Sequence, residues 1–265
     1  METKLMFNMK SIYFTIFVTL FTLPLKAMTF DHSHQAWTEI LNTHVKTFGA
    51  TTQFNYKKLK TSADLKKLNS YLSSLSAVKR PQFNSWKEKE QISFLINTYN
   101  AYTVKLILDN YPVKSIKKIG SFFKNAWKQK FFELFGKKTH LDHVEHGILR
   151  KNFKEPRVHF AVNCASIGCP SLRNEAFVSK KLDQQLDEQA KLFLRDESRN
   201  YIKNGIIHLS KIFDWFDKDF KQKSGSVEKF VAPYMSDDKA LIKKIASGKF
   251  KTKFLNYDWN LNETK

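Results

Sequence analysis

The segment that most constrains the fold is residues 92–108 (ISFLINTYNAYTVKLIL). Placed on a helix at about 100° per residue, its apolar side chains surround nearly the whole circumference. Only Thr98 and Lys105 share a plausible solvent edge. Such a helix must be covered on most sides by the rest of the chain. The pattern therefore predicts the central helix of a globular domain.

The same helix carries a line of polar residues formed by Ser93, Asn97 and Asn100. A buried amide without hydrogen-bond partners costs about 1–3 kcal/mol. We therefore expect these residues either to form a specific buried network or to line a cavity, and the sequence leaves both possibilities open.

The N-terminus has the composition of an export signal. Lys4 and Lys10 precede an uncharged apolar run over residues 11–25, and Ala27 offers a small residue for cleavage. The run is shorter than the roughly 20 residues that span a membrane as a helix. We predict a signal peptide over residues 1–27, with an uncleaved anchor as the alternative.

The predicted mature protein is a single domain over residues 28–265, periplasmic or secreted, with no transmembrane segment after signal cleavage. No cysteine follows the apolar run, so we do not expect a lipoprotein.

The formal charge of the chain is +20, and loss of three lysines and one glutamate with the signal leaves +18. This charge favours acidic partners, such as anionic envelope polymers or an acidic protein. The 39 lysines outnumber the 6 arginines and are scattered along the chain. Because nucleic-acid recognition prefers the arginine fork, this composition argues against specific nucleic-acid binding. Ordinary solvated lysine faces are the other interpretation.

The remaining patterns predict helices more often than strands. Apolar residues at helical spacing mark residues 32–48, 65–75 and 141–150, and Glu145 falls inside the apolar arc of the last of these. Residues 158–163 (VHFAVN) alternate as a strand would, with His159 and Phe160 on opposite faces. The fold class we expect is α+β: a mostly helical single domain packed on a small, mainly antiparallel sheet.

Five motifs resemble one known family, the domain of unknown function 547 family. They are FLINTYNAY (94–102), LDHVEHGILR (141–150), RVHFAVNCASIGCPSLRNEAF (157–177), LSKIFDWFDKDF (209–220) and NYDWNLN (256–262). The resemblance is clearest from about residue 86 to residue 262. It implies a bacterial member that is exported, whereas plant members are intracellular. It implies no reaction, ligand or cofactor.

The two cysteines support more than one chemistry. Cys164 is a candidate nucleophile because it enters a turn whose backbone N–H groups can lower its pKa. His146, backed by Glu145, is the candidate base; His208 with Asp258 is a further possibility. His159 is a poor partner for Cys164 on the opposite face of a strand.

A disulfide between Cys164 and Cys169 is the alternative that we favour. An exported protein with two cysteines normally pairs them. The family resemblance agrees, because plant members carry serine at both positions. A redox-active pair is a third possibility, although the spacing differs from Cys-x-x-Cys.

A second functional hypothesis needs no thiol. Several polar residues of the family motifs fall on apolar faces, and if they converge they form a site for an anionic or amide-containing ligand. These candidate ligand-binding residues are Asn97, Asn100, Arg150, Ser166 and Arg173. A buried structural network is the competing interpretation.

We expect neither a metal nor a cofactor. His140 and His146 lie about 120° apart on a helix, which is strained geometry for ligands of one metal ion. The sequence thus predicts an exported cell-envelope protein with a polar binding site and does not decide whether it is an enzyme. The alternatives are a Cys164-dependent hydrolase or acyltransferase, and a non-catalytic interaction scaffold with a basic surface.

Overall fold

The computed structural model describes residues 30–121 and 124–264. The predicted signal peptide lies outside these residues. Within them, no helix has both the length and the apolar character required to cross a membrane.

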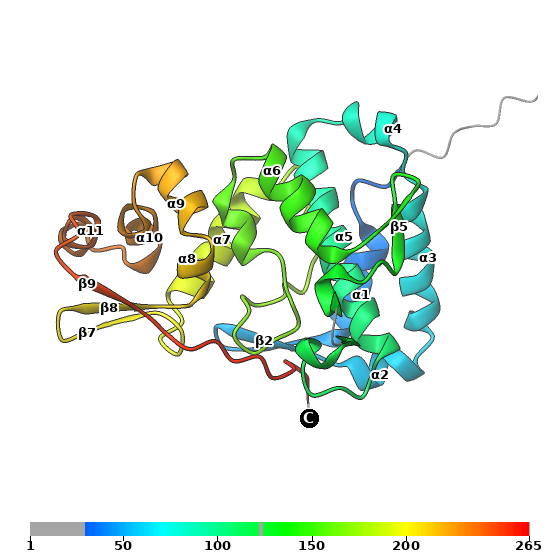
Figure 1. The fold of residues 1–265 in the computed structure, drawn as a ribbon, viewed down its shortest axis with the longest axis horizontal. Helices are drawn as coiled ribbons and strands as arrows, with labels where there is room; N and C mark the ends of the chain where they lie inside the picture. Colours follow the sequence, from blue (N-terminus) through cyan, green and yellow to red (C-terminus); the bar gives the residue numbers. More distant parts are fainter. Residues whose placement is uncertain (1–29, 122–123, 265) are drawn as a thin grey trace, which may run out of the picture.

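Helices dominate the structure (Figure 1). The α-helices are α1 (Gln35–His44), α2 (Tyr56–Thr61), α3 (Asp64–Ala77), α4 (Arg80–Asn84), α5 (Glu88–Asp109), α6 (Arg150–Asn152), α7 (Leu182–Leu194), α8 (Ile212–Trp215), α9 (Asp217–Ser224), α10 (Val227–Met235) and α11 (Lys239–Ala246). Shorter 3₁₀ turns are η1 (Ile116–Lys118), η2 (Ala126–Lys128) and η4 (Pro156–Phe160), and η3 (His143–Leu149) is a π-helix.

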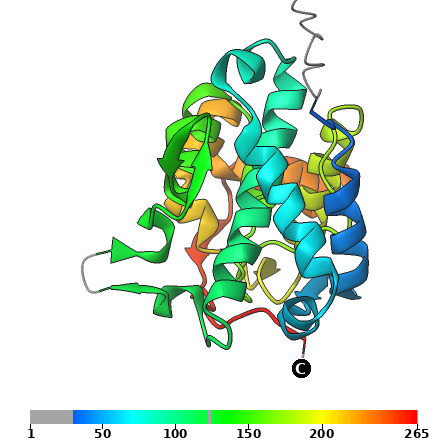
Figure 2. The ribbon, with the colours of Figure 1, turned by 90° about the vertical axis from the view of Figure 1, so that its right-hand side faces the viewer.

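The strands of the described residues form four small sheets. They are β1 (Val45–Phe48), β2 (Thr51–Phe54), β3 (Gly120–Ser121), β4 (Lys124–Asn125), β5 (Phe132–Leu134), β6 (Lys137–Thr139), β7 (Tyr201–Lys203), β8 (Ile206–Leu209) and β9 (Lys251–Phe254). Three sheets are antiparallel pairs, and one of these, β3–β4, projects from the body (Figure 2). In the fourth sheet β8 pairs antiparallel with β7 and parallel with β9. The mostly helical α+β class is confirmed, with separate small sheets in place of a single one.

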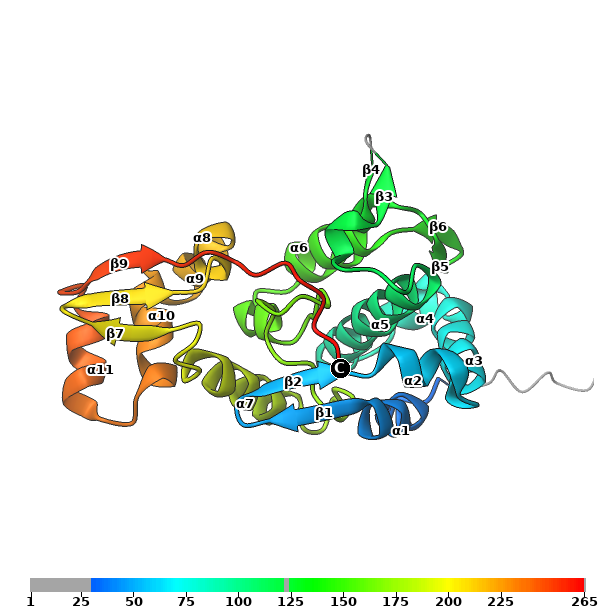
Figure 3. The same ribbon diagram turned by 90° about the horizontal axis from the view of Figure 1, so that it is seen from below.

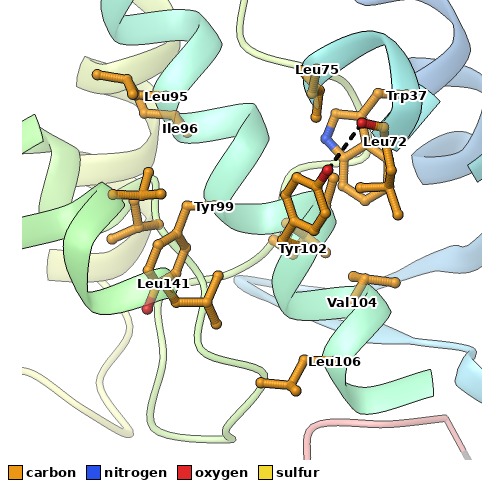
Figure 4. Packing of buried hydrophobic residues seen from close by; sticks show 14 of the residues in the cluster. Trp37, Leu72, Leu75, Leu95, Ile96, Tyr99, Tyr102, Val104, Leu106 and Leu141 are labelled. Atoms are coloured by element: carbon orange, nitrogen blue, oxygen red, sulfur yellow. Dashed lines mark hydrogen bonds between the residues drawn. The ribbon is translucent and has the colours of Figure 1, made fainter. Parts of the chain in front are cut away.

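Helix α5 is the buried centre of the larger apolar cluster, as the sequence predicted. The Glu90 carboxylate accepts the Lys87 N–H at 2.9 Å and closes the first turn. The Tyr102 hydroxyl, which donates to the Leu72 carbonyl at 3.0 Å, joins α5 to α3 (Figure 4). Thr98, which we expected at a solvent edge, is fully buried. Within residues 92–108, only Lys105 keeps partial exposure.

A second apolar cluster lies between α7, α8, α9, α10 and the β7–β8–β9 sheet. Phe160 belongs to this cluster, whereas the neighbouring Val158 belongs to the first. The segment around η4 therefore joins the two cores, and its side chains are buried from both sides.

The strand predicted over residues 158–163 is wrong. Pro156 begins the 3₁₀ helix η4, in which the Val158 N–H donates to the Glu155 carbonyl at 3.1 Å. Every residue from 158 to 163 is buried. An alternating apolar pattern cannot distinguish a buried from an exposed face here, because this segment has no exposed face.

The C-terminal segment after β9 runs back across the molecule and ends beside β2 (Figures 1 and 3). Its backbone bonds to the loop after Cys164: the Gly168 N–H donates to the Asp258 carbonyl at 2.9 Å, and Ser166 pairs with Leu261. This crossing places residues 257–259 against the cysteine loop.

Candidate functional site

One cavity of about 230 Å³ collects residues from several separate parts of the chain. It contains all three predicted catalytic residues, Cys164, His146 and Glu145. The full lining is Tyr99, Asn125, Trp127, Asp142, Glu145, His146, His159, Val162, Cys164, Cys169, Pro170, Ile212, Trp215, Phe216, Tyr257 and Trp259.

The predicted disulfide between Cys164 and Cys169 is wrong. Both cysteines are free thiols, and their sulfurs lie 2.6 Å apart, beyond the roughly 2.05 Å of an S–S bond. The short turn brings the sulfurs together, but as a hydrogen-bonded pair. The Cys164 N–H also donates to the Cys169 sulfur at 2.9 Å.

The surroundings of Cys164 favour its thiolate. The hydrogen bond from the Cys169 thiol lowers the pKa of Cys164 most. Burial raises this pKa, and the hydrogen bond with the Tyr257 hydroxyl at 3.2 Å lowers it further. Together these lower the pKa of Cys164 to about 7. Burial raises the pKa of Cys169 well above its usual value, so Cys169 keeps its proton and can donate it. Low-pKa, partly exposed thiols of this kind are the reactive ones.

The loop that holds Cys164 has an unusual backbone. Ala165 has a φ of 65°, in the left-handed region that an alanine rarely adopts. The Asn163 side chain fixes this turn by accepting the Ala165 N–H at 2.8 Å and donating to the Pro170 carbonyl at 2.8 Å. Backbone strain held by such over-determined contacts is concentrated at functional sites.

Gly168 permits the close approach of the C-terminal segment. A Cβ at this position would lie 3.0 Å from the Asp258 backbone nitrogen and 3.0 Å from the Tyr257 ring. Only glycine therefore lets Tyr257 reach Cys164 without a shift of either segment.

Glu145 is buried on the cavity wall, on the apolar side of its helix as the sequence predicted. Its carbonyl accepts the Arg150 N–H in the wider π-helical pattern of η3. Burial raises the pKa of Glu145, and the neighbouring His146 and Tyr99 offset this only in part. Single π-helical turns often occur at functional sites. Here the turn places a carboxyl group with a raised pKa on the wall of the cavity that holds the thiol pair.

His159 contributes a second titratable group, which the strand prediction had placed away from Cys164. Its Nε2 lies 2.7 Å from Asp219, which also accepts two bonds from Arg150 at 2.7 and 3.0 Å. Because an ionised carboxylate only accepts, Nε2 carries the proton and Nδ1 has a free lone pair. Nδ1 is buried without a hydrogen-bond partner in the described structure. Burial lowers the pKa of His159, despite the opposing effect of Asp219.

Arg150 also organises His146. It donates from Nη1 to His146 Nδ1 at 2.8 Å and so holds the imidazole ring in place on the cavity wall. Burial opposes ionisation of Asp219, but the bonds from His159 and Arg150 outweigh it and hold the pKa of Asp219 well below its usual range. Arg150 itself does not line the cavity.

The residues proposed to bind a ligand do not converge. Asn97 and Asn100 are buried, and each amide joins α5 to the backbone of the motif over residues 157–177. Asn97 donates to the Phe177 carbonyl at 2.7 Å and accepts its N–H at 3.0 Å. Asn100 bonds in the same way to Ala161 and Asn163. These two residues form the structural network that was the competing interpretation.

The other candidates also lie outside the cavity. Arg173 pairs with Glu175 at 2.7 Å and Glu188 at 2.9 Å. Ser166 is fully buried and does not line the cavity, although it helps to lower the pKa of the neighbouring Cys164. His208, the alternative base, stacks on Tyr201 in the β7–β8 hairpin and does not reach Cys164.

Sequence reasoning missed Tyr257, Trp259 and Asp219 as parts of the site. The first two fall in the NYDWNLN motif and Asp219 falls in LSKIFDWFDKDF, so the motifs contained the signal. Among residues 30–121 and 124–264, no group of three or more His, Cys, Asp or Glu side chains is arranged to hold a metal ion.

The fold and the site define an α+β protein with a thiol pair in an aromatic-walled cavity. Residues 83–194 match the family described as "Protein of unknown function, DUF547", which supports the family resemblance of the motifs in this part of the chain. The match includes Glu145, His146, His159 and both cysteines, whereas Asp219 and Tyr257 lie beyond it. No curated protein and no solved structure matches the chain.

Proposed function

We propose that the protein is an exported cysteine-dependent acyl-transfer enzyme, either a hydrolase or an acyltransferase. The observation that carries the proposal is the convergence of Cys164, Glu145 and His159 on one cavity, with the Cys164 sulfur bonded to Tyr257. A nucleophile, a proton donor and a proton acceptor within one partly enclosed space are what acyl transfer requires.

The chemistry starts from the Cys164 thiolate. Its sulfur attacks the carbonyl carbon of an ester or amide, and a C–S bond forms as the bond to the leaving group breaks. Glu145, whose pKa is raised by burial, donates its proton to the departing oxygen or nitrogen. The products of this step are a thioester on Cys164 and an ionised Glu145.

In the second step the Glu145 carboxylate accepts a proton from water while the water oxygen attacks the thioester carbon. The acid leaves and the thiolate is restored. An alcohol or amine in place of water gives acyl transfer by the same steps. His159 lines the same cavity, and its Nδ1, which has no hydrogen-bond partner among the described residues, is a second candidate proton acceptor.

The cavity limits the size of the acyl group. Its volume of about 230 Å³ is below the roughly 300 Å³ at which pockets for drug-sized ligands begin. Three tryptophans on the wall, Trp127, Trp215 and Trp259, provide flat apolar surface. A short or planar acyl group therefore fits better than a long chain.

The proposal is tested with two acetyl esters that differ in leaving group, p-nitrophenyl acetate and ethyl acetate. Cys164→Ala should abolish acetylation, which intact-protein mass spectrometry detects. Glu145→Gln should slow ethyl acetate at the first step but spare acylation by p-nitrophenyl acetate, whose leaving group needs no proton. With p-nitrophenyl acetate the thioester should then accumulate.

Glu197→Gln is the matched control, because Glu197 is exposed and outside the cavity. It should behave like the wild type with both esters. Acetylation that persists in Cys164→Ala, or equal effects of the two glutamine substitutions, would contradict the proposal.

Export is tested separately. N-terminal sequencing of the protein recovered outside the cytoplasm of its native cell should give a chain that begins just after Ala27. Recovery of the full-length chain from the cytoplasm alone would contradict export.

A further inference from the structure

Arg80 differs from the other arginines of the chain. In the described structure each of the other five forms an ion pair with a carboxylate, whereas Arg80 forms none. The five pairs are Arg150–Asp219, Arg157–Glu155, Arg173–Glu175, Arg195–Asp237 and Arg199–Asp196. In a chain that uses lysine for most of its positive charge, an unpaired and partly buried guanidinium indicates a bond to something outside the chain.

Arg80 lines a cavity of about 420 Å³ whose charged walls are entirely basic. The other basic groups are Lys130, Lys137, Lys138, His140 and His143, and no aspartate or glutamate lines it. None of the three lysines forms an ion pair with another described residue. Like charges held together without carboxylates repel one another, and a bound anion would remove that repulsion.

Phe135, which lines this cavity, has a strained backbone. Phe135 has a φ of 56° and Gly136 a φ of 75° in the tight turn between β5 and β6. Two left-handed residues in a hairpin turn favour Asn-Gly, and a bulky side chain at the first position is strained. The Phe135 ring lies 3.8 Å from the Arg80 guanidinium and 4.8 Å from the Phe83 ring. The ring of the strained Phe135 thus packs against the guanidinium of the unpaired Arg80.

We propose that this basic cavity binds a phosphate-bearing anion, such as a phosphate monoester or a diphosphate group. The arginine fork matches phosphate oxygens two at a time, and the three lysines supply the further charge that a dianion or trianion needs. A single carboxylate would leave most of this charge unneutralised. The volume has room for a phosphate group together with part of the molecule that carries it.

The site is distinct from the thiol cavity. The π-helix η3 separates the two: Glu145 and His146 face the thiol cavity, while His143 and Ile148 line the basic one. The inference does not depend on the acyl-transfer proposal, and each can fail without the other.

Isothermal titration of the full domain with inorganic pyrophosphate at low ionic strength tests the inference. The wild type should bind saturably, and Arg80→Gln should weaken the affinity by about tenfold, the loss of one charge-assisted bidentate contact. The control is Arg195→Gln, which removes an exposed arginine outside the cavity and should change the affinity by less than about twofold. No saturable binding to the wild type, or equal losses in both variants, would overturn the inference.

Phe135→Asn keeps the test decisive if Arg80→Gln folds poorly. Asparagine suits the left-handed turn, so the melting temperature should rise while pyrophosphate affinity falls. A variant that is more stable and binds as tightly as the wild type would overturn the role of the Phe135 ring in the site.

The source of the phosphate is distinguished with vesicles of phosphatidylglycerol, sedimented with the wild type and with the Arg80→Gln variant. Vesicle binding that depends on Arg80 would identify a lipid headgroup as the source. Pyrophosphate binding alone would identify a free phosphate compound, and both results support a phosphate site. Binding of neither probe, or vesicle binding that Arg195→Gln reduces as much, would overturn it.

Discussion

Replacing Asn100 with alanine should destabilise the protein by about 2–6 kcal/mol. The Asn100 amide donates to the Ala161 carbonyl at 2.9 Å and accepts the Asn163 N–H at 2.8 Å, and its side chain is almost completely buried. The substitution leaves both backbone groups without a partner in the core. Each buried unsatisfied group costs about 1–3 kcal/mol, which gives the total.

Urea unfolding followed by tryptophan fluorescence measures this change. The loss is a large part of the 5–15 kcal/mol that is typical of a domain, so the midpoint should move well outside experimental error. Asn69→Ala is the matched control because Asn69 is exposed on α3, where alanine favours the helix. A loss below about 0.5 kcal/mol for Asn100→Ala would refute the assignment of this amide as a structural anchor.

Three further outcomes follow from the same structure. Gly168→Ala should displace the 257–258 backbone, weaken the Tyr257 contact and raise the pKa of Cys164; an unchanged alkylation profile would contradict this. Tyr257→Phe should also raise the pKa of Cys164, with unfolding by urea little changed. Burial lowers the pKa of His34 to about 3, whereas the unfolded chain protonates this histidine near pH 6.5. The neutral buried His34 therefore stabilises the folded state above pH 6.5, and this stabilisation is lost as the pH falls below 6.5. His34→Asn, which suits the left-handed φ of 49°, should flatten the loss of unfolding free energy between pH 6 and pH 4 by about 1.4 kcal/mol per pH unit. An unchanged slope in equilibrium urea titrations across that range would contradict it.

The sequence predicted the parts of the structure that depend on local pattern. The all-round apolar character of residues 92–108 identified the buried α5, and the helical arc around Glu145 placed this carboxylate on the inner side. Both conclusions need only the period of a helix and the cost of burying a polar group.

The local sequence pattern gave a wrong prediction where a segment is buried by two apolar clusters at once. Residues 158–163 lie between two cores, so their alternation carried no information about a face, and His159 was placed on the wrong side. Tyr257 reaches Cys164 from 93 positions away, through a chain crossing that no local pattern encodes.

The cysteines show the limit of compositional reasoning. Export and an even cysteine count favoured a disulfide, but the pairing of the sulfurs depends on where the turn holds them. The structure holds them as a thiol pair in which Cys169 donates to Cys164. Two hydrogen-bond donors on one sulfur favour a thiolate, and this difference changes the expected chemistry of the site.

The most direct test of the proposed acyl-transfer site is the pH dependence of Cys164 alkylation by iodoacetamide, read by peptide mapping of the folded protein without reductant. We predict a midpoint near pH 7 for Cys164, little reaction of Cys169, and a higher midpoint for Cys164 in the Tyr257→Phe variant. A midpoint at or above the pH 8.5 of an ordinary thiol, or recovery of the peptide that carries both cysteines unalkylated and lighter by two hydrogens, would contradict the account.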